Sequence, residues 1–321
     1  MAILTGGNFL TSTVLFAFTS YLAVWQLYKL FVSIFPVLYK QFAWGLFFTP
    51  SYFFWGSGIL KDTVAVFCIC MIIVYAYKIF QLKRIKLFTI TWLILLSLLL
   101  LRIKPYLLLA LIPGLIIWFT FDWVKSIRIW IFRVLALPVA IVSVGIIMGL
   151  VYLKSSSGLG NYSAEMALKH ASVIQQDLVR VEAYGSNRFD IGAFEPTLSG
   201  VLKKAPAAIN AGLFRPYIWE SKSFVMLFSG LENLFLLLFT IYSFIKLRFR
   251  LFTEPFNNPI LSFCFIFSIL IAFIVGLTTA NFGALVRYRM QILPFFIIFF
   301  IILNHIVIQK NTADYKPQYF H

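Results

Sequence analysis

Charged side chains are scarce in this sequence of 321 residues. Asp, Glu, Lys and Arg make up 12% of it, against about 25% in an ordinary soluble domain, and only 11 residues are acidic. Hydrophobic residues make up 61% and aromatic residues 19%, and the mean hydropathy is +0.92. This composition excludes a soluble globular domain, a disordered chain and a secreted disulfide scaffold. It predicts a polytopic membrane protein whose helices face lipid.

Residues that bind metals and motifs that bind nucleotides are also rare. The sequence has three cysteines, all within apolar stretches where a thiol usually packs as a small apolar group, and three histidines that lie far apart. It has no Walker loop, no Rossmann glycine pattern, no HExxH motif and no adjacent pair of aspartates. We therefore expect no disulfide, no metal site and no cofactor.

Long apolar runs dominate the sequence instead. Runs of about 17 to 25 residues cross a bilayer as helices, and we predict an all-α transmembrane bundle of about nine spans. The predicted spans are residues 9–28, 37–54, 63–80, 86–101, 106–121, 131–153, 224–246, 259–277 and 292–308. The second is the least regular, because Lys40, Gln41 and Pro50 lie near its ends, so a re-entrant or broken helix is an alternative there.

One long connection divides the predicted helices into two groups. The organisation that we predict is N-terminal transmembrane helices in 1–153, an extracytoplasmic loop in 154–222, C-terminal transmembrane helices in 223–309 and a cytoplasmic tail in 310–321. Within the loop, residues 163–183 read as an amphipathic helix and residues 197–211 as a second helical piece.

The net charge of +16 would suggest a nucleic-acid partner in a soluble chain. Here the basic residues lie between apolar runs, which indicates the positive-inside bias and contact with membrane lipids, and no nucleic acid. About half of the 27 basic residues fall in alternate connections, which we assign to the cytoplasm. The exceptions lie in short outer loops and indicate an anionic ligand at the outer face: Lys61, Arg102, Lys104, Arg287 and Arg289.

Two outer turns in the first half contain candidate functional residues. Residues 50–62 interrupt an apolar stretch with Pro, Gly and Ser and end at Asp62, which is either a helix-dipole partner or a catalytic carboxylate. Residues 102–106 form a tight turn in which Arg102 and Lys104 either reach lipid headgroups or bind a phosphate, followed by Tyr106.

Two further candidate regions lie in the second half. Before the last span, Arg287 and Arg289 flank Tyr288; arginine holds phosphate oxygens with two parallel hydrogen bonds, although anchoring at the membrane interface is the alternative. The outer loop ends with Arg215 and Tyr217, while Glu232 lies inside the next apolar span. A carboxylate at that depth costs at least about 2.5 kcal/mol if unpaired, so Glu232 is expected to be paired or functional.

On these outer motifs the chain resembles bacterial envelope-glycan enzymes, in particular the GT-C type glycosyltransferases and the O-antigen polymerase and ligase group. The resemblance implies transfer of a sugar or glycan from a polyprenyl phosphate or pyrophosphate carrier at the outer face of the bacterial inner membrane. It departs from the family pattern in one respect: these enzymes usually have an acidic base in the first outer loop, whereas the first clear outer acid here is Asp62.

The resemblance implies that arginines hold the carrier phosphate, and from it we derive a hypothesis for the roles of the candidate residues. Asp62 or Glu232 would orient or deprotonate the acceptor hydroxyl. The phosphate would be held by Arg102, Lys104, Arg215, Arg287 and Arg289, and the sugar or acceptor contacted by Tyr106, Tyr217 and Tyr288. Two alternatives are a transporter or flippase of an anionic lipid or glycan and a noncatalytic subunit of an envelope complex.

Overall fold

The computed structural model describes residues 5–126, 188–195 and 197–311. Within these ranges the regular structure is helical, and the strand-like pairing is limited to one isolated antiparallel bridge between Arg188 and Asn281. The all-α fold class is therefore confirmed for this part of the chain. The predicted amphipathic helix at 163–183 and the predicted span at 131–153 lie outside the described residues.

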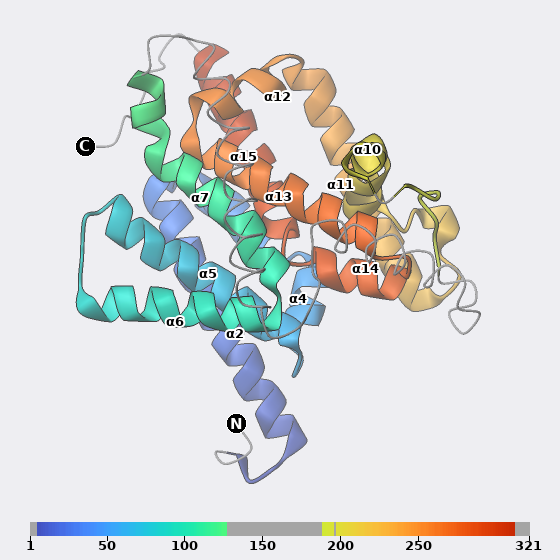
Figure 1. Cartoon of the computed structure of the whole chain (residues 1–321), viewed down its shortest axis with the longest axis horizontal. Coiled ribbons are helices and arrows are strands. Elements are labelled where there is room, and N and C mark those ends of the chain that lie inside the picture. Colours follow the sequence, from blue (N-terminus) through green and yellow to red (C-terminus); the bar gives the residue numbers. More distant parts are fainter. Residues whose placement is uncertain (1–4, 127–187, 196, 312–321) are drawn as a thin grey trace.

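Figure 1 shows the described helices, which are joined by short connections except between α7 and α10. Their order is α2 (Phe9–Ile34), η1 (Pro36–Leu38), α3 (Tyr39–Phe47), α4 (Pro50–Gly56), α5 (Lys61–Phe80), α6 (Leu87–Ile103), α7 (Pro105–Ser126), α10 (Leu198–Phe214), η3 (Ile218–Glu220), α11 (Phe224–Leu247), α12 (Arg250–Thr253), η4 (Pro255–Asn257), α13 (Pro259–Thr278), α14 (Phe282–Arg289) and α15 (Leu293–Asn311).

Polar residues just before several helices fix where those helices begin. The side chains of Asn8, Thr197, Ser223, Asn258 and Asn281 each accept a hydrogen bond from a backbone N–H in the first turn of the helix that follows. Such a cap satisfies a donor that has no partner within the helix and contributes about 1 kcal/mol. The caps therefore fix the residue at which each of these helices begins.

Five of the described helices have the length and apolarity needed to cross a membrane: α2, α5, α11, α13 and α15. The helix α6 and the stretch Pro105–Phe121 of α7 are apolar but shorter. All seven helices overlap predicted spans. Five of the nine predicted spans therefore correspond to a described helix that is long enough to cross a membrane, and two correspond to a shorter apolar helix.

The predicted second span, 37–54, is broken. Pro36 begins η1, α3 extends over nine residues, and Pro50 begins the seven-residue α4. A proline has no N–H to donate, and it disfavours a helical conformation in the residue before it. Neither α3 nor α4 is long enough to cross a bilayer, so the alternative of a broken helix describes this segment.

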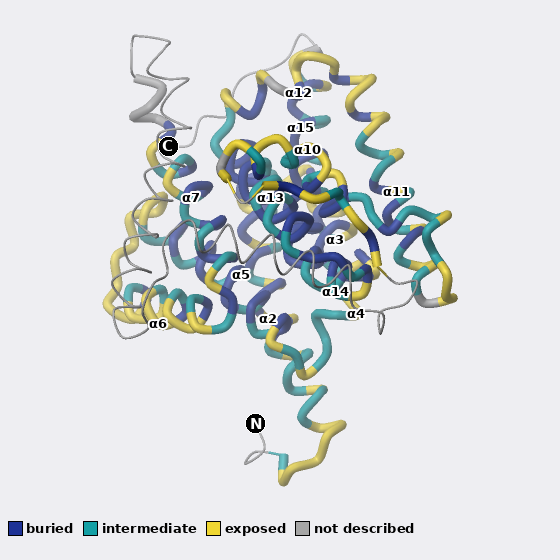
Figure 2. Tube along the Cα trace, turned by 45° about the vertical axis from the view of Figure 1, so that its right-hand side comes forward, coloured by how far each residue is buried: buried dark blue, intermediate teal, exposed yellow. Residues whose placement is uncertain are grey.

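The helix α13 lies at the centre of the bundle. Of its apolar window 72% is buried, compared with 22% for α11, and Figure 2 shows the same contrast along the two tubes. On one side α13 packs against α10 so closely that a Cβ atom on Gly276 would lie 1.9 Å from the carbonyl oxygen of Ala208. A Cβ on Gly212 would similarly lie 2.1 Å from the oxygen of Ala272. Small residues thus allow the two backbones to touch, as is typical of membrane helices.

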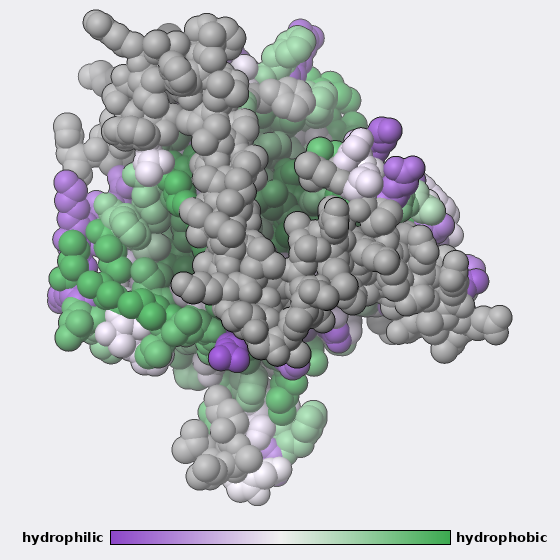
Figure 3. All heavy atoms as spheres, in the orientation of Figure 1, coloured by the Kyte–Doolittle hydropathy of each residue, from purple (hydrophilic) through white to green (hydrophobic). Residues whose placement is uncertain are grey.

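Large apolar side chains cover the outside of the bundle. Leu87, Phe88 and Leu98 of α6 are exposed, and Figure 3 shows an apolar surface where α6 lies. The first half of α2 extends beyond the other helices in Figure 1, with Phe9 and Leu10 more than 70% exposed. Apolar surface of this extent on long helices fits contact with lipid, and the chain has the architecture of a multi-pass membrane protein.

The contact between α10 and α13 gives a direct test of the packing. We expect Gly276→Ala to lower the melting temperature of the detergent-purified protein, because the added methyl group would force the two backbones apart at a typical cost of about 1–3 kcal/mol. Gly56→Ala is the matched control, because a Cβ atom there would meet nothing within 4 Å. Equal melting temperatures for the two variants would contradict the close packing of α10 on α13.

Candidate functional site

Asp62 is the centre of a buried polar cluster at one end of the bundle. It lies in the first turn of α5, where a negative charge is favoured by the helix dipole, and it is only 3% exposed. Its Oδ1 accepts hydrogen bonds from Nζ of Lys104 and, at 2.9 Å, from Nε2 of Gln291. Its Oδ2 lies 3.5 Å from Nε of Arg287. The carboxylate thus joins three segments that are far apart in the sequence.

Lys104 reaches Asp62 from the turn between α6 and α7. Its backbone is not helical (φ −149°, ψ 80°), and a proline disfavours the helical conformation in the residue before it. This ends α6 and lets Pro105 begin α7. The ammonium group lies 4.4 Å from the centre of the Tyr288 ring and 5.8 Å from that of Tyr106. Burial lowers the pKa of Lys104, and the negative charge of Asp62 opposes this shift.

Arg287 and Tyr288 come from α14, whose start is fixed by Asn281. Arg287 donates from Nη2 to the Tyr288 hydroxyl at 3.1 Å. The side chain of Arg287 is 35% exposed, whereas that of Lys104 is 8% exposed. The buried hydroxyl of Tyr106 has no hydrogen-bond partner among the described residues. The Tyr106 hydroxyl is therefore a donor that none of the described residues uses.

These side chains line a cavity of about 410 Å³. Its polar and aromatic lining consists of Lys61, Asp62, Lys104, Tyr106, Thr278, Arg287 and Tyr288. The apolar part of the lining consists of Leu60, Ile103, Ile274 and Val275. The lining holds three cations and one carboxylate, so the cavity has an excess of positive charge and suits an anion.

A second buried group contains two other predicted site residues. Arg289 is fully buried and donates from Nη1 to the backbone oxygens of Leu213 and Arg215, both at 3.0 Å. Glu232 accepts hydrogen bonds from the backbone N–H and the hydroxyl of Ser51. Neither residue belongs to the cavity lining. Arg289 thus holds the end of α10, and Glu232 holds α4.

A third group contains Arg215 and Tyr217. Arg215 forms an ion pair with Glu220 and stacks on Phe189 at 4.7 Å, while the Tyr217 hydroxyl accepts a hydrogen bond from Asn210 at 2.6 Å. Their polar groups are thus engaged within the protein. Arg102 is exposed on α6 and lies outside the described lining of the cavity.

The structure therefore brings together five of the ten predicted site residues: Asp62, Lys104, Tyr106, Arg287 and Tyr288. Gln291 was missed by the sequence analysis, although it is the one polar residue between Arg289 and the final apolar helix. Ser51 lay within a predicted motif but had no assigned role, because its partner Glu232 is 181 positions away.

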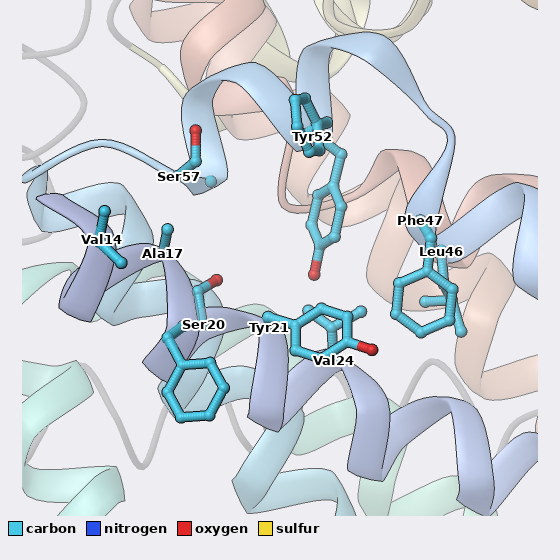
Figure 4. A pocket seen from close by; sticks show the side chains of 12 residues that line it. Val14, Ala17, Ser20, Tyr21, Val24, Leu46, Phe47, Tyr52 and Ser57 are labelled. Atoms are coloured by element: carbon cyan, nitrogen blue, oxygen red, sulfur yellow. The ribbon is translucent and has the colours of Figure 1, made fainter.

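An apolar groove lies near the cavity, between α2, α3 and α4 (Figure 4). Its volume is about 350 Å³, and Figure 4 shows Tyr52 pointing from α4 toward α2. The groove is lined by Val14, Ala17, Phe18, Ser20, Tyr21, Val24, Leu46, Phe47, Tyr52, Phe53, Gly56 and Ser57. Its lining carries no charge and suits an apolar chain.

No protein-family model matches this sequence, and no curated protein or solved structure matches it significantly. The functional argument therefore depends on the geometry of the site.

The ion pair between Asp62 and Lys104 makes a testable contribution to stability. We expect Asp62→Asn to lower the melting temperature strongly, because breaking one partner of a buried pair leaves an uncompensated charge and costs about 3–5 kcal/mol. Adding Lys104→Met to this variant removes that charge, and we expect the double variant to recover much of the loss. If Asp62→Asn alone melts like the wild type, the pair does not hold this end of the bundle together.

Proposed function

We propose that this chain is a membrane glycosyltransferase or polysaccharide polymerase that takes a sugar or glycan from a polyprenyl phosphate carrier at the outer face of the bacterial inner membrane. The single observation that supports this proposal is the convergence of three outer motifs on one cavity. Asp62, Lys104 and Arg287 come from turns that lie far apart in the sequence, and all three line it.

The charge of the cavity favours a phosphate group as the ligand. Lys61 and Lys104 supply ammonium groups, and Arg287 supplies a guanidinium that can donate two parallel hydrogen bonds to phosphate oxygens. Lys61 also lies at the start of α5, where a cation is disfavoured by the helix dipole. A bound phosphate would compensate for this concentration of positive charge.

The apolar groove provides a place for the isoprenoid chain of the same carrier. Ser57 lines the groove and Leu60 lines the cavity. Three residues of extended chain span at most about 10 Å, so the two sites lie close enough for one lipid to occupy both. A phosphate with a long apolar chain therefore fits this pair of sites better than free phosphate does.

In the proposed transfer, the acceptor oxygen forms a bond to the anomeric carbon as the bond from that carbon to the phosphate oxygen breaks. The phosphate leaves with the electron pair, and Lys104 and Arg287 stabilise its growing negative charge. Asp62, the carboxylate in the lining, orients the acceptor hydroxyl and receives its proton. The rings of Tyr106 and Tyr288 contact the sugar. Glu232 lies outside the lining and takes no chemical step.

Binding of farnesyl phosphate to the protein in lipid nanodiscs tests the phosphate site. We expect Arg287→Gln to raise the dissociation constant by about tenfold, the effect of losing a hydrogen bond between charged groups. Arg102→Gln is the matched control, because this side chain is exposed outside the cavity, and we expect no more than about a twofold change. Equal effects of the two substitutions would indicate attraction to the membrane surface and contradict a phosphate site.

The transfer reaction requires a separate test in cells that depend on this gene for a surface glycan. We expect Arg287→Gln to abolish the glycan while the protein remains in the membrane at its normal level. Normal glycan in this variant would contradict the proposed reaction. Binding of the lipid without any transfer by the purified protein would also contradict it and would favour the flippase alternative.

A further inference from the structure

Glu232 is a carboxylate within an apolar helix, and its contacts identify what it does there. It lies eight positions after Phe224, the first residue of α11, where a charge needs a partner. The backbone N–H of Ser51 donates to Glu232 Oε2 at 3.1 Å, and the Ser51 hydroxyl donates to the same oxygen. Ser51 lies in the first turn of α4, so Glu232 attaches α4 to α11.

Arg289 interacts electrostatically with Glu232 without forming an ion pair with it among the described residues. Burial lowers the pKa of Arg289 to about 10, and the negative charge of Glu232 opposes this shift. Arg289 thus remains charged at neutral pH. Its Nε and Nη2 and the Oε1 of Glu232 are buried without a hydrogen-bond partner among the described residues.

A continuous series of contacts connects Glu232 to the cavity. The helix α4 begins at Pro50, beside Ser51, and ends at Gly56. The hydroxyl of Thr63 then donates to the backbone oxygen of Gly58 at 2.6 Å, with the oxygen of Trp55 at 3.4 Å. Thr63 is only 2% exposed and directly follows Asp62. The path therefore runs from Glu232 through Ser51, α4 and Thr63 to Asp62.

We infer that Glu232 is a positioning residue for the cavity: it holds Ser51, and through α4 and Thr63 it fixes the turn that carries Lys61 and Asp62. The inference deepens the proposed function, and its test by lipid binding rests on that function. Its test by lysine acetylation depends only on the geometry. Asp62 holds Lys104 in a buried ion pair, so loosening this turn would expose the Lys104 amine.

Acetylation of lysines by succinimidyl acetate, followed by mass spectrometry of the full chain in nanodiscs, measures this exposure. We expect Glu232→Ala to accelerate acetylation of Lys104 by about tenfold, the effect of one lost hydrogen bond to a charged group. Glu232→Gln should react more slowly than Glu232→Ala, because an amide oxygen still accepts from Ser51. Ser51→Ala removes only the hydroxyl donor to Glu232 and should also accelerate acetylation of Lys104. It replaces Glu232→Ala in the test if that variant fails to fold.

Two other lysines serve as internal controls. Lys203 is exposed on α10 and should react at the same rate in all variants. Lys310 forms an ion pair with Glu254 at 2.7 Å near the end of α15, so its rate reports general unfolding. An unchanged Lys104 rate in Glu232→Ala and Ser51→Ala would overturn the inference. So would equal acceleration of Lys104 and Lys310, which would assign Glu232 to overall stability.

Binding of farnesyl phosphate completes the test. We expect Glu232→Ala to weaken binding by about tenfold and Glu232→Gln to weaken it less. Wild-type affinity in Glu232→Ala would overturn the positioning role and leave the proposed function intact. If the wild-type protein itself does not bind farnesyl phosphate, the proposed function fails, and the acetylation rates still decide the role of Glu232.

Discussion

One end of the bundle depends on the buried ion pair between Asp62 and Lys104. Neither charge is tolerated alone in so apolar a chain, because removing an ion from water costs several kcal/mol. The pair therefore fixes the start of α5 to the turn between α6 and α7. Gln291 and Arg287 approach the same carboxylate, which adds α14 and the connection after it. One carboxylate thus determines the arrangement of three segments that are far apart in the sequence.

This arrangement divides the basic residues into two groups. Arg289 and Arg215 contact backbone oxygens and Glu220, so they stabilise the fold. Lys61, Lys104 and Arg287 line the cavity, where Asp62 balances only one of their charges. Lys104 and Arg287 are held in place by Asp62, so these two charges are present in the cavity before any ligand binds. A site organised in this way binds an anion without the cost of ordering its side chains.

Composition and apolar runs predicted the all-α class and the positions of the long helices, because both follow from local hydropathy. The polar motifs were also recognisable from the sequence. Their roles were not, because roles depend on which side of a helix faces the cavity. Arg287 and Arg289 are two positions apart and so point about 200° apart around α14; the structure places the first at the cavity and the second in the interior. The pairing of Glu232 with Ser51 likewise requires the tertiary fold.

The most direct test compares the binding of undecaprenyl phosphate with that of undecaprenol to the wild-type protein in nanodiscs. The two lipids share the isoprenoid chain and differ only in the phosphate group. If Lys104 and Arg287 hold that phosphate, the phosphorylated lipid should bind at least about tenfold more tightly, and Arg287→Gln should reduce this preference. Equal affinities of the two lipids would contradict the central claim that the cavity is a phosphate site.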